Sequence, residues 1–331
     1  MSIAEKIQNW YEKNGRDLPW RVKGGAHPSA YRVWISEIML QQTTVTTVLP
    51  YFDRFLERFP TIEALAAAPL ADVLLLWQGL GYYTRARKLH ECARVLVERH
   101  GGVFPADRKA LRALPGIGDY TSASIAAFAF NLPEAVVDGN VIRVLTRLNG
   151  RVEPVASIGN DIDDAAAALM KSAPCPADHA SAMMDLGATV CTPKSPKCLL
   201  CPLQSDCRAF RDGTTDKIPN ISKPKRDKRK GYAFAVENAD GALMIRKRTE
   251  KGLLHGLYEL PWNTDGSLPF DADWEKTDIA VRHVFTHFDL TLEIVRLTTE
   301  TPFADGFFVC REELENYPFS TMMKKVLKAS L

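Results

Sequence analysis

Four cysteines between positions 191 and 207 are the side chains whose spacing says most about chemistry. Cys191, Cys198, Cys201 and Cys207 follow the pattern C-x6-C-x2-C-x5-C. That pattern brings four thiolates into one short loop, as a tetrahedral metal ion or a four-iron cluster requires. Zinc ribbons usually pair two C-x2-C units, whereas these four cysteines are unevenly spaced. The spacing predicts a metal centre and by itself leaves zinc and an iron–sulfur cluster both open.

Two carboxylates stand where catalysis could use them. Glu37 interrupts an otherwise apolar helix face, with Ile35, Ile38 and Met39 beside it. A carboxyl group held there would be partly desolvated, which raises its pKa and suits it to act as an acid. Asp138 follows an apolar run and precedes a helical stretch. From the residues alone, Glu37 could equally be a surface glutamate and Asp138 a plain helix N-cap.

A glycine-rich turn precedes an apolar helical segment. The run 114–121, LPGIGDYT, carries Gly116 and Gly118 at the junction. Glycines there permit a tight turn, and the bare backbone amides at the start of a helix attract phosphate groups. Without further evidence this segment could also be an ordinary turn.

These three segments together resemble one enzyme family. The run 34–43, WISEIMLQQT, matches W-x-S-E-x-M-L-Q-Q-T of the MutY-type adenine DNA glycosylases, and the cysteine loop and the 114–121 hairpin are similar to those of the wider endonuclease III superfamily. The segments 16–21 (RDLPWR) and 79–87 (GLGYYTRAR) also resemble the family. The likeness spans essentially the whole chain, although the loop at 22–30 is longer than the common family form.

The resemblance implies a monofunctional glycosylase of base excision repair that removes adenine opposite 8-oxoguanine or guanine. Bifunctional relatives place a lysine nucleophile where this chain has Tyr120, and a tyrosine cannot form a Schiff base with the sugar. By the resemblance the cysteines hold a 4Fe-4S cluster. The implied catalytic residues are Glu37, Asp138, Tyr120 and Asn140. The implied DNA- and base-binding residues are Arg21, Gln41, Gln42, Tyr82, Gly116, Gly118, Phe285, Thr286 and His287.

The last three of these belong to a second expected domain. The segment 252–262 resembles the entry to the Nudix-like domain of MutY proteins, and Phe285-Thr286-His287 resembles that family's F-S-H loop for 8-oxoguanine, with threonine in place of serine. Threonine keeps the hydroxyl, but its β-branch could crowd the base. The segment 311–314 (REEL) imitates the centre of the Nudix hydrolase motif, but the glycine and the first glutamate that the motif requires would fall on Leu297 and Phe303. The metal site of a true hydrolase is therefore absent, and this domain is expected to bind rather than hydrolyse.

Hydrophobic periodicity supports this division into two domains. Apolar spacing predicts an all-α region with helices at 31–48, 62–67, 84–99, 121–130 and 140–148. Farther on, strands are predicted at 232–236 and 242–248, joined by a hairpin at Asp240-Gly241, and at 279–285 and 290–297, followed by a helix at 321–328. We therefore expect a helical domain over 1–211, a basic linker over 212–230 and a small α+β domain over 231–331.

The composition limits the other possibilities. A formal charge of +2 is ordinary for a soluble protein, but positive charge is concentrated between residues 208 and 230. No run of about eighteen apolar residues exists, so we expect a cytoplasmic protein. The family resemblance further implies a bacterial, nucleoid-associated monomer whose partner is double-stranded DNA with A opposite 8-oxoguanine or G. Two alternatives remain: a thymine or oxidised-pyrimidine glycosylase of the same fold, and a non-catalytic cluster-bearing DNA-binding protein.

Overall fold

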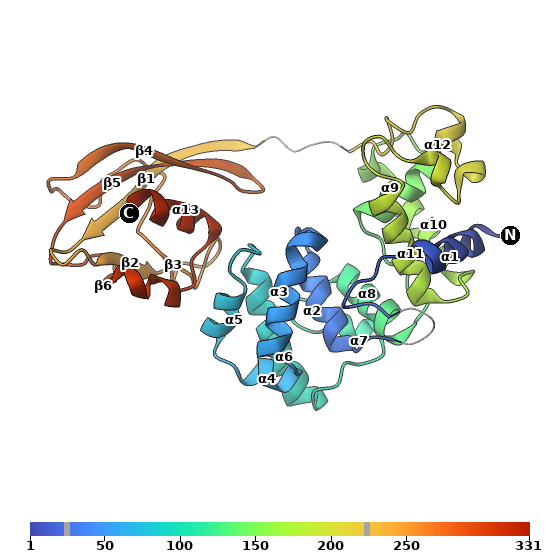
Figure 1. Ribbon diagram of the computed structural model, residues 1–331, viewed down its shortest axis with the longest axis horizontal. Coiled ribbons are helices and arrows are strands. Elements are labelled where there is room, and N and C mark those ends of the chain that lie inside the picture. The colour runs from blue at the N-terminus through green and yellow to red at the C-terminus, as the bar shows by residue number, and fades with distance from the viewer. Residues whose placement is uncertain (23–26, 222–225) are drawn as a thin grey trace. The chain divides into compact units, whose positions relative to one another are not determined.

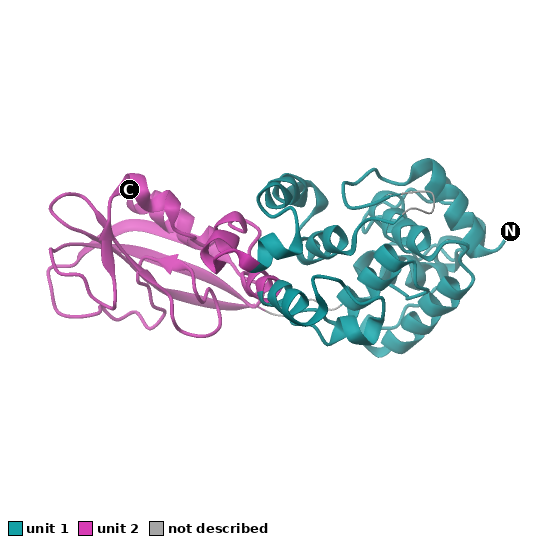
Figure 2. Ribbon diagram, turned by 90° about the horizontal axis from the view of Figure 1, so that it is seen from below, with its two compact units in different colours: residues 1–66, 91–222 teal, residues 67–90, 223–331 magenta. Residues whose placement is uncertain are grey.

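The computed structural model describes residues 1–22, 27–221 and 226–331. Part of the long loop at 22–30 and part of the expected linker, residues 23–26 and 222–225, lie outside the described residues. The chain forms two compact units, one of residues 1–66 and 91–222 and the other of residues 67–90 and 223–331 (Figure 2). No helix in the described ranges is long and apolar enough to cross a membrane.

The first unit is helical, as the periodicity predicts. Its helices are α1 (Ile3–Asn14), α2 (Ala30–Leu40), α3 (Val45–Arg58), α4 (Ile62–Ala67), the second half of α6 (Thr84–His100), α7 (Arg108–Arg112), α8 (Asp119–Phe130), α9 (Gly139–Leu148), α10 (Gly159–Lys171), α11 (Pro176–Thr189) and α12 (Arg208–Arg211) (Figure 1). Helix α8 packs against α2, and α11 packs against α1, α8 and α9. These contacts bring the segments around residues 37, 120 and 138 together.

One predicted helix, 31–48, is wrong. The structure breaks it into α2 and α3 at the turn 41–44, where Gln42 adopts a left-handed backbone with φ +61°. Thr43 and Thr44 follow Gln42 with β-branches that lower helix propensity, and Thr44 is the N-cap of α3. The break places the two glutamines of the motif at the end of α2 rather than inside a helix.

The second unit is built on a mixed sheet. Its strands are β1 (Asp227–Glu237), β2 (Leu243–Lys247), β3 (Tyr258–Glu259), β4 (Glu275–Val284), β5 (Phe288–Thr298) and β6 (Phe307–Val309). The strand order is β3-β2-β1-β5-β4, with β6 also paired to β2; β1 and β5 run parallel and the other pairs are antiparallel. The predicted hairpin at Asp240-Gly241 is confirmed, because Gly241 has φ +76° and β1 and β2 pair across it.

The sheet has an apolar cluster on each face. Helix α13 (Thr321–Ser330) buries Met322, Met323 and Val326 with the side chains of one face, while Phe234 and Met244 belong to the cluster on the other. The unit also contains α5 (Leu70–Leu76) and the start of α6.

Strand β1 begins earlier than the sequence predicts. The expected linker ran to residue 230, but residues 227–230 pair with β5 and belong to the sheet. The polar composition of these residues hid a strand whose side chains are exposed.

Candidate active site and DNA-contacting elements

One cavity in the helical unit collects all four residues predicted to be catalytic. It has a volume of about 710 Å³, and Glu37 enters it from α2, Tyr120 from α8, and Asp138 and Asn140 from the start of α9. Arg21, Gln41 and Gln42 from the predicted DNA- and base-binding set line the same cavity. The helix packing thus brings together residues that lie about a hundred positions apart in the chain.

Glu37 is held in a protonatable state by its surroundings. Its side chain lies on the buried face of α2 and the residue is 6% exposed. Burial raises the pKa of Glu37 to about 7, although hydrogen bonds from Tyr120 and Ser124 and the charge of Arg21 act to lower it. A carboxyl group with a pKa near neutrality can both donate and accept a proton at physiological pH.

Asp138 is both the N-cap of α9 and a wall of the cavity. Its Oδ1 accepts hydrogen bonds from the backbone N–H groups of Asn140 (2.9 Å) and Val141 (2.8 Å), and its Oδ2 accepts from Asn140 Nδ2 at 2.8 Å. The cap and the active-site position therefore coincide in one residue. The three donors fix the orientation of the carboxylate toward the cavity.

Tyr120 stays neutral in this environment. Burial raises the pKa of Tyr120 well above its ordinary value, and the nearby charges of Glu37 and Asp138 act in the same direction. Its hydroxyl therefore remains a hydrogen-bond donor to Glu37. Ser124, one helical turn later on α8, is a second partner of Glu37 that the sequence did not single out.

Helix α9 joins this cavity to the cysteine loop through two arginines that sequence reasoning missed. Arg143 donates to Asn140 Oδ1 (2.8 Å) and also to the carbonyls of Gly187 and Cys191 (both 2.7 Å). One turn farther, Arg147 donates to the carbonyl of Thr192 at 2.7 Å. Two arginines four residues apart on an amphipathic helix were the available signal. Their bonds fix Asn140 relative to the loop.

The N-terminal segment is fixed in the cavity wall by a buried aspartate. Asp185 on α11 is fully buried and accepts from the backbone N–H and the Nε of Arg16, both at 2.8 Å, and from Arg21 at 2.7 Å. Burial alone would raise the pKa of Asp185, but Arg21 and Arg16 outweigh it and lower the pKa. This contact holds Arg21 where its charge acts on Glu37.

The four cysteines of the loop line one small cavity of about 30 Å³ together with Arg147. None of the four forms a disulfide, and in the described residues no group of three or more His, Cys, Asp or Glu side chains is arranged to hold a single metal ion. A single tetrahedral zinc would hold its sulfurs at about 2.3 Å from the metal and so about 3.8 Å from one another. A four-iron cluster binds each thiolate to a different iron and spaces them more widely, so the donor set fits the cluster.

The hairpin before α8 has the backbone that phosphate binding requires. Gly116 has φ +74°, in the region that favours glycine. Gly118 is the N-cap of α8, and a Cβ there would meet nothing within 4 Å. The packing of the free protein thus gives no reason for glycine at 118, whereas a closely approaching ligand would.

Two residues of the predicted DNA-contacting set share an unusual backbone. Gln42 and Tyr82 have φ of +61° and +48°, a left-handed conformation that non-glycine residues rarely adopt. Tyr82 lies in the second unit, is 49% exposed, and follows Gly79 and Gly81, which also have positive φ. Such strain at exposed tips is typical of functional positions.

Arg85 supports the turn that carries Tyr82. Its guanidinium donates to the carbonyls of Leu80 (2.9 Å) and Gly81 (3.2 Å) and lies 5.5 Å from the ring centres of both Trp77 and Tyr82. Burial lowers the pKa of Arg85 to about 10, so it remains charged. Sequence analysis placed Arg85 in the family-like segment 79–87 but assigned it no role.

A second cavity, of about 490 Å³, lies in the second unit where Tyr82 meets the predicted 8-oxoguanine loop. Phe285, Thr286 and His287 line it together with Tyr82 and Leu254. The hydroxyl of Tyr82 hydrogen-bonds that of Thr286. Phe285 packs on Phe288 with ring centres 4.7 Å apart, whereas Thr286 and His287 are exposed. Two polar side chains of the loop are therefore available to a ligand, while Phe285 supports them.

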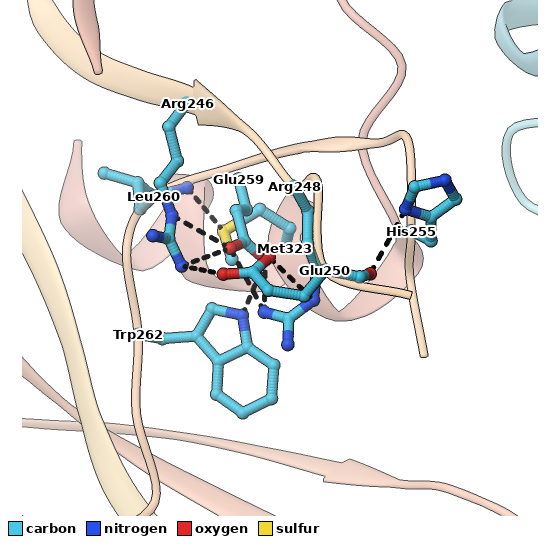
Figure 3. A network of polar contacts seen from close by, with 8 residues as sticks. All are labelled: Arg246, Arg248, Glu250, His255, Glu259, Leu260, Trp262 and Met323. Carbon is cyan, nitrogen blue, oxygen red and sulfur yellow. Dashed lines mark hydrogen bonds and ion pairs between the residues drawn. The ribbon is translucent and has the colours of Figure 1, made fainter. Parts of the chain in front are cut away.

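A buried polar network fixes the loop that forms one wall of this cavity (Figure 3). Glu259, 2% exposed, accepts from Arg246 (3.0 Å), Arg248 (3.2 Å) and Trp262 Nε1 (2.8 Å). Arg248 directly precedes the loop 249–256. Its carbonyl accepts a hydrogen bond from the backbone N–H of Gly256 at 2.8 Å, which closes the two ends of the loop. The guanidinium of Arg248 also stacks over the Trp262 ring, 5.2 Å from the ring centre, which further holds Arg248 in place. The network thus anchors the two ends of this loop to the sheet.

Comparison with known proteins identifies the family. Residues 35–155 match the HhH-GPD superfamily of base excision DNA repair proteins, residues 191–207 the iron–sulfur binding domain of endonuclease III, and residues 232–329 the NUDIX domain. The adenine DNA glycosylase of Rattus norvegicus is 35% identical, over 99% of this chain and 77% of the relative. The chain belongs to the adenine DNA glycosylase family. It is therefore a DNA glycosylase of base excision repair with an iron–sulfur cluster and a Nudix-like second domain.

Other relatives and solved structures agree with this assignment. The adenine DNA glycosylase of Mycolicibacterium smegmatis is 46% identical over 63% of this chain and 70% of its own length. A thermostable thymine-DNA glycosylase structure has a TM-score of 0.56 at 30% identity, covering 63% of this chain and 95% of that one. An endonuclease III–DNA complex, at 24% identity and a TM-score of 0.52, shares the fold. Because the fold is common to enzymes with different bases, the substrate must follow from the site.

Proposed function

We propose that this adenine DNA glycosylase family member hydrolyses the N-glycosidic bond of adenine mispaired with 8-oxoguanine or guanine, without cleaving the strand. The observation that carries the proposal is the buried Glu37 beside Asp138 in one cavity, with its pKa raised to about 7. Adenine in a duplex cannot reach a buried acid, so the nucleotide must leave the stack at a cost of a few kcal/mol.

Glu37 and Asp138 divide the chemistry between them. Protonated Glu37 donates its proton to a ring nitrogen of adenine while the glycosidic bond breaks, and the bonding electrons leave with the now neutral base. The carboxylate of Asp138 offsets the positive charge that develops on the sugar. Ionised Glu37 then takes a proton from the water that attacks the sugar carbon, which returns the enzyme to its starting state.

The other cavity residues orient these two. Tyr120 donates to Glu37, and Asn140 holds Oδ2 of Asp138. Tyr120 occupies the place of a lysine nucleophile, which favours hydrolysis over an imine mechanism. The four cysteines would hold the cluster, which would brace the loop as a scaffold. Arg143 and Arg147 connect that loop to α9.

The DNA is held by elements outside the cavity. The amides of the Gly116–Gly118 hairpin are suited to bind the phosphate backbone. Gln42 and Tyr82, both in left-handed tips, are suited to fill the gap that the extruded nucleotide leaves. Thr286 and His287 are suited to recognise 8-oxoguanine through polar contacts. Because its substrate is DNA, we expect the protein to act as a monomer at the bacterial nucleoid.

The test is base release from defined duplexes followed by alkaline cleavage. Duplexes carry A opposite 8-oxoguanine, A opposite G, T opposite G, or thymine glycol, and single-turnover rates are compared. Release of adenine, fastest opposite 8-oxoguanine, is expected. Release of thymine or of the oxidised pyrimidine would instead assign the enzyme to another branch of the fold.

The recognition of 8-oxoguanine is tested separately by Thr286→Val, which keeps the β-branched shape and removes the hydroxyl. A polar contact that becomes buried when DNA covers Thr286 would contribute about 1–3 kcal/mol, or roughly five- to 150-fold. In the variant, the rates and the dissociation constants for A opposite 8-oxoguanine and for A opposite G should become more alike, so that both ratios move toward one. Unchanged ratios would show that the hydroxyl does not recognise the base. Thr299→Val, outside the lining of this cavity, is the matched control.

A further inference from the structure

The β4–β5 hairpin that carries Thr286 has a third strand beside its tip. Strand β1 enters the sheet there: the backbone N–H of Asp227 donates to the carbonyl of His287 at 3.3 Å, and residues 227–230 pair with residues 288–291 of β5 (Figure 1). The basic segment that the sequence assigned to a linker is therefore partly an ordered extension of the loop expected to recognise 8-oxoguanine.

The pairing separates the charges of this extension by face. Side chains alternate along a strand, so Lys228 and Lys230 share a face and Arg229 takes the other. Arg229 stacks over the Phe288 ring at 4.1 Å, on the face that α13 covers. Lys230 is in register with Thr291, which is in register with Arg282 of β4. Lys228, Lys230 and Arg282 thus form one exposed group on the opposite face, which we call the basic face.

The basic face has no stabilising purpose in the protein itself. All three side chains are exposed, and in the described residues no hydrogen bond or ion pair involves them. Asp289 is in register with Lys228 and lies on the same face, but its carboxylate is paired with Arg226, at 4.0 Å. Lys230 and Arg282 lie on either side of Thr291, on strands that are not neighbours, and the described residues show no ion pair for any of the three cations, so all three are available to an external anion.

We propose that the basic face binds the phosphodiester backbone of the DNA strand that the Thr286 hairpin contacts. The proposal rests on the proposed function and adds to it a positioning surface. Residues two apart on a strand are separated by about 6.6 Å, so Lys228 and Lys230 can engage neighbouring phosphates rather than one. Phosphate contacts of this type fix the register of a protein on DNA and carry no sequence information.

The experiment compares the full-length holoenzyme with a triple variant, Lys228→Gln, Lys230→Gln and Arg282→Gln. A matched control removes the same charge from exposed lysines elsewhere in the unit, Lys247→Gln, Lys324→Gln and Lys328→Gln. Dissociation constants are measured between 50 and 300 mM NaCl for a duplex with A opposite 8-oxoguanine and for the same sequence undamaged.

Each lost phosphate contact should reduce the slope of log K against log salt by about 0.9, so the triple variant should lose roughly 2 to 3 units of slope and at least tenfold in affinity near 0.1 M salt. The loss should be equal for both duplexes, and the control should keep the wild-type slope. An unchanged slope, or a loss confined to the 8-oxoguanine duplex, overturns the proposal. The single-turnover rate of adenine release at saturating enzyme should not change. The specificity of the wild-type enzyme for the different duplexes is measured separately, so a failure of the proposed function can be told apart from a failure of this proposal.

Discussion

Replacing Glu37 by glutamine should inactivate the enzyme and stabilise it at the same time. Glutamine keeps the shape and can still hydrogen-bond, but it can neither protonate adenine nor become charged. Because the pKa of Glu37 rises from 4.5 in the unfolded chain to about 7 in the fold, ionising this buried group above pH 7 costs the folded state free energy. The variant does not bear this cost.

The magnitude follows from linkage. A raised carboxyl pKa means that the folded state binds the proton more tightly, so the contribution of Glu37 to stability is intact below pH 4.5 and is lost as pH rises through 7. The shift corresponds to about 3 kcal/mol. The stabilisation of Glu37→Gln over wild type should therefore be close to zero near pH 4.5, grow up to pH 7 and remain level above it. For a domain of about 200 residues this corresponds to roughly 6–12 °C in Tm at pH 8.

The assay is thermal unfolding by circular dichroism between pH 5 and 9 at a fixed scan rate, with single-turnover adenine release measured in parallel. Glu57→Gln, which removes an exposed acid from α3, is the control and should shift Tm little at any pH. Wild-type release should be level below pH 7 and fall about tenfold per pH unit above it, since only protonated Glu37 acts as the acid. If Glu37→Gln is only as stable as wild type at pH 8, or if it keeps more than about a tenth of the wild-type single-turnover rate, the reasoning is refuted.

Four further outcomes follow from the structure. Asp138→Asn should lower the single-turnover rate by about 10²–10³ because it removes a charge from the developing cation, yet change stability by less than about 1 kcal/mol because asparagine is an equally good N-cap; rate and Tm together check this. Borohydride should trap no covalent protein–DNA complex, since Tyr120 cannot form an imine, and efficient trapping on gels would contradict the hydrolytic route. Metal analysis should find about four irons per chain, whereas one zinc per chain would remove the cluster from this account. Arg85→Lys should weaken mispair binding about three- to tenfold in the wild-type background but have no further effect in a Tyr82→Ala background, and additive losses in this double-mutant cycle would show that Arg85 does not act through Tyr82.

The sequence by itself determined the parts whose physics is local. The cysteine spacing predicted a metal loop because four thiolates within one short segment must lie close together. Helical and strand periods separated a helical region from an α+β region because each period reflects one buried face. The hairpin at Gly241 was predicted correctly because only a few residue types permit its backbone. The resemblance of 34–43 to a family motif then drew attention to Glu37.

Only the tertiary structure decided the properties that depend on several segments at once. From the residues alone Glu37 could have been a surface side chain. Its raised pKa arises because packing against α8 buries it, and the hydrogen bonds from Tyr120 and Ser124 offset this burial only in part. The break of the predicted helix at Gln42, the bonds from Arg143 to the cysteine loop, and the strand hidden in the basic linker were likewise beyond local patterns. Burial, desolvation and cross-strand pairing are set by residues far away in the chain, so no local spacing could reveal them.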